Sequence, residues 1–319
     1  MEKARPSSLN TRLPEIQALL RAALAEDIGA GDVTSEALVP PGLIAVGTFT
    51  AKEDGVVAGL PLLQPLFGQI DPDAFVKTPV ADGAAVRRGT RLAEVHASAR
   101  ALLAGERTAL NFLQHLSGIA TRTRRFVQTL RNPRCRILDT RKTLPGMRLL
   151  EKYAVRAGGG ENHRIGLFDQ ALVKDNHLAL ARGQGSGVRG RKSGDRGPGT
   201  GDFYREIVSL ARQKAPPGSP IEIEVATPEE ALAAAEGGAD IILLDNMTLP
   251  RIRRAVSLVR ARRNRAGSPL LEVSGGVTLS RVRAIGEAGV DRISVGALTH
   301  SAPALDIAMK IRPVMRHES

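Results

Sequence analysis

Two adjacent cations, Arg141 and Lys142, follow a short apolar stretch in the segment ILDTRKTLPG (residues 137–146). The apolar stretch is typical of a buried strand, and the Leu-Pro-Gly end is typical of a turn. Adjacent cations repel each other unless a negative group lies near both. The segment therefore predicts a site for an anionic ligand at the end of a strand.

The same arrangement, an apolar stretch followed by polar or glycine residues, recurs along the second part of the chain. In a parallel α/β barrel the carboxyl ends of all strands meet at one face, where catalytic groups collect. The repetition predicts that cations, carboxylates and glycine-rich turns surround one cavity. In chain order the strand-end residues are Arg141 and Lys142, then Lys174, then Glu224, then Asp245, then Ser274, Gly275 and Gly276, then Ser294, Val295 and Gly296.

Small residues follow the last two of these strands, in SGGVTLSRV and SVGALTH. Glycine lets backbone N–H groups approach an anion closely, and the start of a helix adds a favourable dipole. The two loops together predict a phosphate site, which barrels often build at their last two strands. Ordinary turn chemistry, which also favours Gly and Ser, is the alternative for either loop by itself.

Glu224 and Asp245 are the acidic residues of the strand-end set. Two carboxylates facing a phosphate site predict Mg²⁺, shared with phosphate oxygens and water. Two alternatives stay open: the carboxylates hydrogen-bond to sugar hydroxyls, or they only balance the neighbouring cations.

Three further basic residues lie outside the strand ends. His163 and Arg164 follow three glycines in AGGGENHRIGLFD, which indicates a loop that bends tightly into the site. Arg107 lies near the start of a helix outside the barrel, where a single arginine is usually a surface residue. The arginines of residues 251–265 alternate with apolar residues at helical spacing and are typical of a solvated helix face.

Alternating strands and helices are expected to position these residues. Such alternation implies parallel pairing with right-handed crossovers, and the apolar strands fit a sheet covered on both faces. We expect a barrel or partial barrel, with a doubly wound open sheet as the alternative that periodicity leaves open. The expected strands are residues 136–140, 171–174, 221–225, 241–245, 270–274 and 292–296, and the expected helices are residues 149–156, 203–214, 228–236, 249–265 and 279–287.

The first part of the chain has a different pattern. Short β-type segments lie between residues 43 and 98, after a helical stretch at residues 13–26. Residues 102–130 are expected to form one or two helices with a break near Gly118. In the second part, the Gly- and Arg-rich residues 182–201 predict a flexible insertion.

The composition of the 319 residues, 42% hydrophobic and 24% charged, is that of an ordinary globular protein. The net charge of +12 favours anionic partners. An aromatic content of 3% argues against single-stranded nucleic acid, because its bases stack on aromatic side chains. A single cysteine allows no disulfide within the chain, and no apolar run reaches membrane-spanning length. We expect a cytoplasmic protein that binds small anions and neither nucleic acid nor a membrane.

Several motifs together resemble one known family. In chain order they are GERTALNFLQHLSGIAT, LDTRKTLPGMRLLEKYAV, GGGENHRIGLFD, VKDNH, EIEV, ILLDN, SGG and SVGALTHS. From about residue 13 to residue 311 the chain is similar to the quinolinate phosphoribosyltransferases, the carboxylating nicotinate-nucleotide pyrophosphorylases. The resemblance implies transfer of phosphoribosyl from phosphoribosyl pyrophosphate to quinolinate with Mg²⁺. The implied products are nicotinate mononucleotide, pyrophosphate and CO₂, in NAD biosynthesis.

The resemblance also implies an architecture. An N-terminal α/β sandwich domain (residues 1–130) precedes a C-terminal open α/β barrel (residues 131–319), which carries the insertion at residues 182–201. A homodimer with shared active sites is implied, with larger assemblies allowed. In such a dimer the sandwich domain of one subunit closes the barrel of the other.

Roles for individual residues follow from the resemblance alone. Arg107 would reach the site of the partner subunit, and Lys142 would face both substrates. Glu224 and Asp245 would serve the ribose hydroxyls and Mg²⁺. The implied ligands of the quinolinate carboxylates are Arg141, His163, Arg164 and Lys174. The implied catalytic set is Arg107, Arg141, Lys142, Lys174, Glu224 and Asp245. Further implied substrate contacts are Thr140, Ser274, Gly275, Gly276, Ser294, Val295, Gly296 and His300.

Three alternative functions stay open. A close relative could transfer phosphoribosyl to nicotinate or another acid without loss of CO₂. A paralogue associated with molybdate transport is a second alternative. A nucleic-acid-binding protein that kept the barrel as a scaffold is the third, and the low aromatic content and the complete motif set argue against it.

Overall fold

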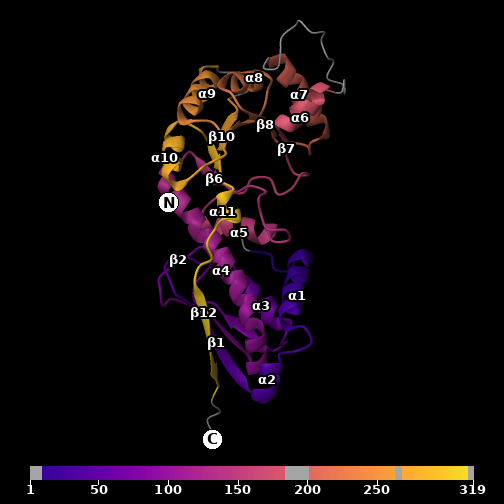
Figure 1. Cartoon of the computed structure of the whole chain (residues 1–319), viewed down its shortest axis with the longest axis vertical. Coiled ribbons are helices and arrows are strands. Elements are labelled where there is room, and N and C mark those ends of the chain that lie inside the picture. The colour runs from indigo at the N-terminus through magenta and orange to yellow at the C-terminus, as the bar shows by residue number, and fades with distance from the viewer. Residues whose placement is uncertain (1–8, 184–200, 263–267, 315–319) are drawn as a thin grey trace. The chain divides into compact units, whose positions relative to one another are not determined.

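The computed structural model describes residues 9–183, 201–262 and 268–314, which form two compact units (Figure 1). The first unit contains the described parts of Met1–Arg124, Thr143–Gly160 and Ala297–Ser319. The second contains those of Arg125–Lys142 and Glu161–Gly296. The chain passes between the units more than once, and the domain boundary expected at residue 130 stays a prediction.

A four-stranded antiparallel sheet lies in the first unit, in the order β12-β1-β5-β3. Alternate residues of β1 are buried, as in a sheet with one covered face. The local pattern does not predict β12, because its pairing joins Ala51 to Ile307 across most of the chain. The strands are β1 (Ile44–Ala51), β3 (Phe75–Lys77), β5 (Arg91–Ser98) and β12 (Ile307–Pro313), with a separate pair formed by β2 (Gly55–Val56) and β4 (Ala85–Val86).

The first helix of this unit confirms the prediction for residues 13–26. It begins at Pro14, whose fixed φ suits a first helical turn, and buries Ile16, Leu20 and Leu24 at a spacing of four. Several other helices are too short for periodicity to reveal. The helices are α1 (Pro14–Ile28), α2 (Val33–Leu38), η1 (Leu60–Leu62), α3 (Leu63–Gly68), α5 (Arg148–Gly158) and α11 (Ala297–His300).

The predicted break near Gly118 is wrong, because α4 (Ala99–Leu130) runs through it as one helix of 32 residues. The glycine has a different purpose. A Cβ at Gly118 would collide with the carbonyl oxygen of Pro303, so only glycine allows the two backbones to approach this closely. Among the helices of the described residues, none is long and apolar enough to cross a membrane.

The second unit contains a six-stranded parallel sheet in the order β6-β11-β10-β9-β8-β7. The last strand lies beside the first, and the remaining strands follow in chain order. A doubly wound sheet would reverse direction at a switch point, whereas this order is that of a barrel opened between β6 and β7. The expected open α/β barrel is therefore confirmed. Its strands are β6 (Arg136–Leu138), β7 (Ala171–Val173), β8 (Ile221–Val225), β9 (Ile241–Asp245), β10 (Leu270–Ser274) and β11 (Arg292–Ser294).

Helices connect these strands, and most agree with the prediction (Figure 1). A capping box at Thr227 starts α8, since Thr227 and Glu230 each satisfy a backbone N–H of the other. The helix predicted for residues 249–265 ends earlier, at Ala261, because the backbone of Arg262 is extended. The predicted insertion at residues 182–201 lies mostly outside the described residues. The helices are α6 (Asp175–Gly183), α7 (Gly201–Lys214), α8 (Pro228–Glu236), α9 (Leu249–Ala261) and α10 (Leu279–Glu287).

Candidate active site

The strand-end residues of the second unit lie along one edge of the parallel sheet, as predicted. Ser274 is paired in register with Asp245, and Glu224 is paired with Leu243, two residues before Asp245. Residues two apart on a strand point to the same face. Glu224 and Asp245 therefore lie on neighbouring strands, with their side chains on the same face.

Lys174 and Glu224 form an ion pair across this edge. The Lys174 Nζ lies 3.3 Å from a Glu224 carboxylate oxygen, and the Glu224 side chain is only 13% exposed. The backbone N–H of Lys174 donates to Nδ1 of His177, which fixes the turn into α6. The structure thus brings together one predicted cation and one predicted carboxylate.

The loop after β10 depends on glycine, above all at position 275. Gly275 and Gly276 have φ values of 88° and 56°, in the left-handed region. A Cβ at Gly275 would also collide with the side chain of Asn246. The Arg281 guanidinium donates to the carbonyl of Gly276 at 2.8 Å and holds the loop in place.

Asn246 lies at the site but is not among the residues predicted from the sequence. It has a positive φ of 50°, which Asn tolerates better than most residues. Its amide Nδ2 donates to Asp245 at 2.8 Å, and its backbone N–H donates to the carbonyl of Ser274 at 2.9 Å. The Asp-Asn pair at the end of ILLDN was the available signal, because Asn is common where a strand must turn sharply.

The loop after β11 is more buried. Ser294 is 3% exposed and Val295 is 2% exposed. The backbone N–H of Val295 donates to the carbonyl of Leu138 at 2.9 Å. Because this N–H is already used, Val295 does not donate it to an anion. Ser294 and Gly296 are then the predicted phosphate contacts of this loop.

Two arginines of the site lie close enough to affect each other. Burial lowers the pKa of Arg164 first, and the charge of Arg141 lowers it further. Arg164 is 7% exposed, and its guanidinium donates to the carbonyl of Gln170 at 3.1 Å. The turn before Arg141 is set by Thr140, whose hydroxyl accepts from the backbone N–H of Lys142 at 3.1 Å. Two neighbouring guanidiniums, one buried and one half-buried, favour an anion near both of them.

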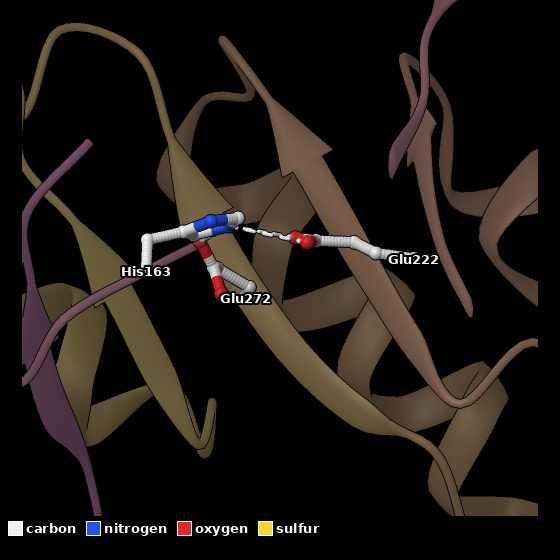
Figure 2. Close-up of side chains that lie close together, drawn as sticks. All are labelled: His163, Glu222 and Glu272. Atoms are coloured by element: carbon white, nitrogen blue, oxygen red, sulfur yellow. Dashed lines mark hydrogen bonds and ion pairs between the residues drawn. The ribbon is translucent and has the colours of Figure 1, made fainter. Parts of the chain in front are cut away.

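His163, which directly precedes Arg164, lies in a buried cluster with Glu222 of β8 and Glu272 of β10, whose side chains share one face of the parallel sheet (Figure 2). The His163 Nε2 is 3.1 Å from Glu222 and 3.3 Å from Glu272. Arg292 is 3.0 Å from the other oxygen of Glu272, and Gln170 donates to Glu222 at 2.8 Å. Both glutamates are fully buried.

The contacts within this cluster shift the pKa values of His163 and Glu222. Burial by itself lowers the pKa of His163, but hydrogen bonds to Glu222 and Glu272 and their charges outweigh it and raise the pKa to about 9. The pKa of Glu222 is raised, first by burial and then by the charge of Glu272. Within the described residues this trio has the spacing of a metal site, but Arg292 already pairs with Glu272, and Gln170 already donates to the Glu222 oxygen that lies nearest His163.

Glu222, Glu272 and Arg292 are not among the residues predicted from the strand ends. Each lies two positions before a predicted residue. The signal was present in IEIEV, where Glu222 and Glu224 alternate with apolar residues and must share a face. A charged residue within the apolar strand LLEVS was a second signal.

Arg107 and His300 belong to the first unit and are not part of the arrangement described above. Arg107 lies on α4 and is exposed. His300 is also exposed, and its Nδ1 lies 2.6 Å from the hydroxyl oxygen of Ser301. Their predicted roles stay predictions.

An open α/β barrel whose carboxyl edge carries cations, carboxylates and two glycine-containing loops is typical of enzymes that bind several anionic groups at once. The chain belongs to the quinolinate phosphoribosyl transferase family. The C-terminal domain of that family matches residues 119–310, and the N-terminal domain matches residues 32–117.

Relatives across this family are similar along nearly the whole chain. The chloroplastic nicotinate-nucleotide pyrophosphorylase [carboxylating] of Oryza sativa is 41% identical, covering 93% of this chain and 78% of its own length. A probable enzyme of the same name from Bacillus subtilis is 39% identical, with 93% of both chains covered. The crystal structure of NadC from Streptococcus pyogenes is 38% identical with a TM-score of 0.83, covering 97% of this chain and 100% of that one.

Proposed function

We propose that this protein transfers phosphoribosyl from phosphoribosyl pyrophosphate to quinolinate with loss of CO₂, giving nicotinate mononucleotide and pyrophosphate for NAD biosynthesis. Family membership and the names of the relatives support the reaction class. The observation that carries the choice of substrate is that Arg164 is buried and that the half-buried Arg141 is near enough for its charge to lower the pKa of Arg164. Quinolinate has two carboxylates on adjacent ring carbons, and two neighbouring cations suit two neighbouring negative charges.

The side chains of the site divide between the two substrates. Arg141, Arg164 and Lys174 bind the carboxylates of quinolinate, and Lys142 faces both substrates from the exposed end of its turn. The phosphate lies against Ser274–Gly276 and Ser294–Gly296, where glycine allows backbone N–H groups to approach an anion. Holding the ring nitrogen in line with C1 of the ribose supplies orientation, a large part of catalysis in two-substrate reactions.

The bond changes follow from this arrangement. The bond between ribose C1 and pyrophosphate breaks, and its electron pair leaves with pyrophosphate. The nitrogen lone pair of quinolinate forms the new bond to C1, and the ring nitrogen becomes cationic. The carboxylate on the neighbouring carbon then leaves as CO₂, and the remaining electron pair, stabilised by the cationic nitrogen, takes a proton from water. Glu224 and Asp245 stabilise the positive charge that develops on the ribose.

Mg²⁺ is the proposed cofactor, and the residues present fit it. Glu224 and Asp245 offer carboxylate oxygens from neighbouring strands, on one face of the sheet. Mg²⁺ is commonly bound by one or two carboxylates together with phosphate oxygens of the substrate. When bound, the ion stabilises negative charge on the departing pyrophosphate. Lys174 lies 3.3 Å from Glu224 and balances the charge of this carboxylate.

We also propose a cytoplasmic homodimer in which Arg107 reaches the site of the partner subunit. The exposed position of Arg107 on α4 supports this reading. Mixing inactive Arg107→Ala and Lys142→Ala subunits tests it. Activity must reappear in mixed dimers, because one of their two sites then contains both intact residues. A mixture that stays inactive after subunit exchange would rule out the shared site.

The substrate assay tests the reaction itself. The purified protein is incubated with phosphoribosyl pyrophosphate, Mg²⁺ and either quinolinate or nicotinate, and nicotinate mononucleotide and CO₂ are measured. We expect turnover of quinolinate with one CO₂ for each nucleotide, and none when Mg²⁺ is removed with a chelator. Turnover of nicotinate but not of quinolinate would overturn the proposal. Tight, salt-sensitive RNA binding without turnover would revive the nucleic-acid alternative.

Arg141→Ala sharpens the assignment of the carboxylate site. A charge-assisted hydrogen bond contributes about 1.5–3 kcal/mol, so kcat/KM for quinolinate should fall roughly tenfold to several-hundredfold. The matched control is Arg253→Ala, which removes an exposed arginine from α9 and should leave kcat/KM unchanged. Equal effects of the two substitutions would contradict the assignment.

A further inference from the structure

A short helix, α5, lies between the two segments that carry the candidate ligands of an anion. The segment before it carries Arg141 and Lys142, and the segment after it carries His163 and Arg164. Both segments belong to the second unit, whereas Thr143–Gly160, which contains α5, belongs to the first. Because the chain is continuous, the contacts that hold the two ends of α5 also determine where the two segments begin.

Arg124 of α4 holds the C-terminal end of α5. Its Nε donates to the carbonyl of Gly158 at 2.8 Å, and one of its Nη atoms donates to the carbonyl of Ala157 at 3.3 Å. That Nη also donates to the carbonyl of Gly83, 3.2 Å away, in the loop before β4. The last carbonyls of a helix have no partner within the helix, and a nearby cation interacts favourably with the helix dipole. Arg124 thus satisfies this end of α5 and joins it to another part of the first unit.

The chain leaves α5 in a fixed direction. A Cβ at Gly158 would lie 2.5 Å from the Cβ of Thr123, so only glycine allows this end of α5 to approach α4 so closely. Gly159 has a φ of 93°, in the left-handed region. The backbone N–H groups of Gly159 and Gly160 donate to carbonyls of the last helical turn at 2.9 Å and 3.0 Å, as in a Schellman motif. The backbone that leads to Arg164 therefore starts from a defined position.

Two other side chains hold α5 at its start and along its length. Glu151 is fully buried, and its Oε1 accepts the backbone N–H of Leu144 at 3.4 Å and lies 2.9 Å from Nε2 of His115 on α4. Leu144 belongs to the turn that directly follows the two strand-end cations. The hydroxyl of Tyr153, a buried residue, donates to Asp82 at 2.7 Å. All of these contacts lie within the first unit.

We propose that Arg124 is a positioning residue for the quinolinate site: it holds the end of α5 and thereby sets the position from which Arg164 reaches the substrate. Glu151 does the same at the start of α5 for the segment that carries Arg141. The inference rests on the proposed function, in which Arg141 and Arg164 bind the carboxylates of quinolinate. A displacement of about 1 Å far from the reacting atoms can cost roughly a hundredfold in rate, so contacts outside the site affect binding and catalysis.

The first test is hydrogen–deuterium exchange, which needs no substrate. In Arg124→Ala the amides of Gly159 and Gly160 should exchange about tenfold faster or more, because a charge-assisted hydrogen bond no longer holds the end of α5. The amides of β1, in the sheet of the same unit, should be unchanged. The matched control is Arg125→Ala, which removes the exposed arginine next in the chain and should change neither region. Unchanged exchange at the two glycines, or an equal increase in β1, would overturn the inference.

The second test is kinetic and uses whichever acid, quinolinate or nicotinate, the unaltered protein turns over. Arg124→Ala should raise KM for the acid about tenfold and KM for phosphoribosyl pyrophosphate less than about threefold, because the predicted phosphate loops after β10 and β11 are not adjacent to α5 in the chain. Arg124→Lys should recover part of the affinity, since lysine can donate to one of the helix carbonyls. A lower rate with both KM values unchanged would indicate only a loss of folded enzyme and would contradict the inference. If neither acid turns over, the proposed function fails, and the exchange test still decides the inference.

Discussion

The two sheets of this protein bury different kinds of side chain. The covered face of the antiparallel sheet is apolar, and its largest member, Phe49, contacts Phe67 edge to face with ring centroids 6.4 Å apart. The inner face of the parallel sheet carries Glu222 and Glu272, both fully buried, with Arg292 beside them. Alternation of residues along the strand produces both faces.

This difference separates stability from function. Burial of apolar surface contributes about 25 cal/mol for each Å² removed from water. Burial of charges costs solvation, and pairing offsets that cost only when the geometry is good. A charged interior is therefore a poor way to stabilise a sheet. It is a good way to hold cations such as Arg164 in a fixed orientation beneath a binding site.

Phe49→Ala should destabilise the antiparallel sheet and have the largest effect on stability. Removing a buried aromatic ring leaves a cavity and lowers the free energy of unfolding by about 3–5 kcal/mol. Urea denaturation followed by circular dichroism measures the loss. The matched control is Phe75→Ala, because Phe75 is 53% exposed on β3, an edge strand of the same sheet, and its loss should cost far less. Equal losses for the two phenylalanines would contradict the apolar reading of this face.

Arg292→Ala should destabilise the parallel sheet by a somewhat smaller amount. It removes a partner of Glu272 and leaves a buried carboxylate undercompensated, which costs about 3 kcal/mol for pairs of this kind. The comparison variant combines Arg292→Met with Glu272→Gln, which removes both charges and keeps similar volumes. We expect the double variant to be more stable than Arg292→Ala by denaturation. A double variant less stable than the single one would show that the pair itself, and not its imbalance, supplies the stability.

Much of the fold could be predicted because it depends on local pattern. The bounds of β8, β9 and β10 match the expected strands, since short apolar runs between turn signals define them. Gly118 shows the limit of this reasoning. A glycine in a helical pattern predicts a break. Here the helix continues, and glycine is required because the backbone of Pro303, distant in sequence, packs against it.

The strand-end and loop residues of the candidate site could be predicted, but the charged network behind them could not. Lys174, Glu224 and the Gly275 loop follow from the rule that parallel strands deliver their ends to one edge. The cluster of His163, Glu222 and Glu272 depends on how the strands are paired. β9 lies between β8 and β10, and the register places Glu222 of β8 and Glu272 of β10 on either side of β9. Register between strands distant in sequence cannot be read from either strand alone.

Asp71→Asn compares a charge at the surface of the apolar sheet with the buried charges. The backbone N–H of Ser98 donates to Asp71 at 2.8 Å and lowers the pKa of that carboxyl, against the opposing effect of burial. A lowered folded pKa stabilises the protein above the unfolded value of 3.8, and this stabilisation is lost as the pH falls through the folded pKa. Because solvent screens this group, we expect a loss of about 1 kcal/mol in the variant at neutral pH.

The pH dependence is the decisive part of that prediction. The difference in unfolding free energy between Asp71→Asn and the unaltered protein should shrink as the pH falls below 3.8. Asp73→Asn is the control, because it removes a charge from the same turn and leaves the bond to Ser98 in place. If the difference in unfolding free energy does not change with pH, the Asp71→Asn variant is destabilised for a reason other than the lost charge.

Arg91→Ala is the smallest change and completes the comparison with Arg292→Ala, because both remove an arginine paired with a glutamate on a sheet. The Arg91 guanidinium lies 2.8 Å from Glu94, but the two side chains are 63% and 25% exposed, against 17% and 0% for Arg292 and Glu272. Water solvates Glu94 once its partner is gone, so the loss of stability should be below about 0.5 kcal/mol and should vanish in high salt. If Arg91→Ala and Arg292→Ala cost the same, burial would not be what distinguishes the two sheets.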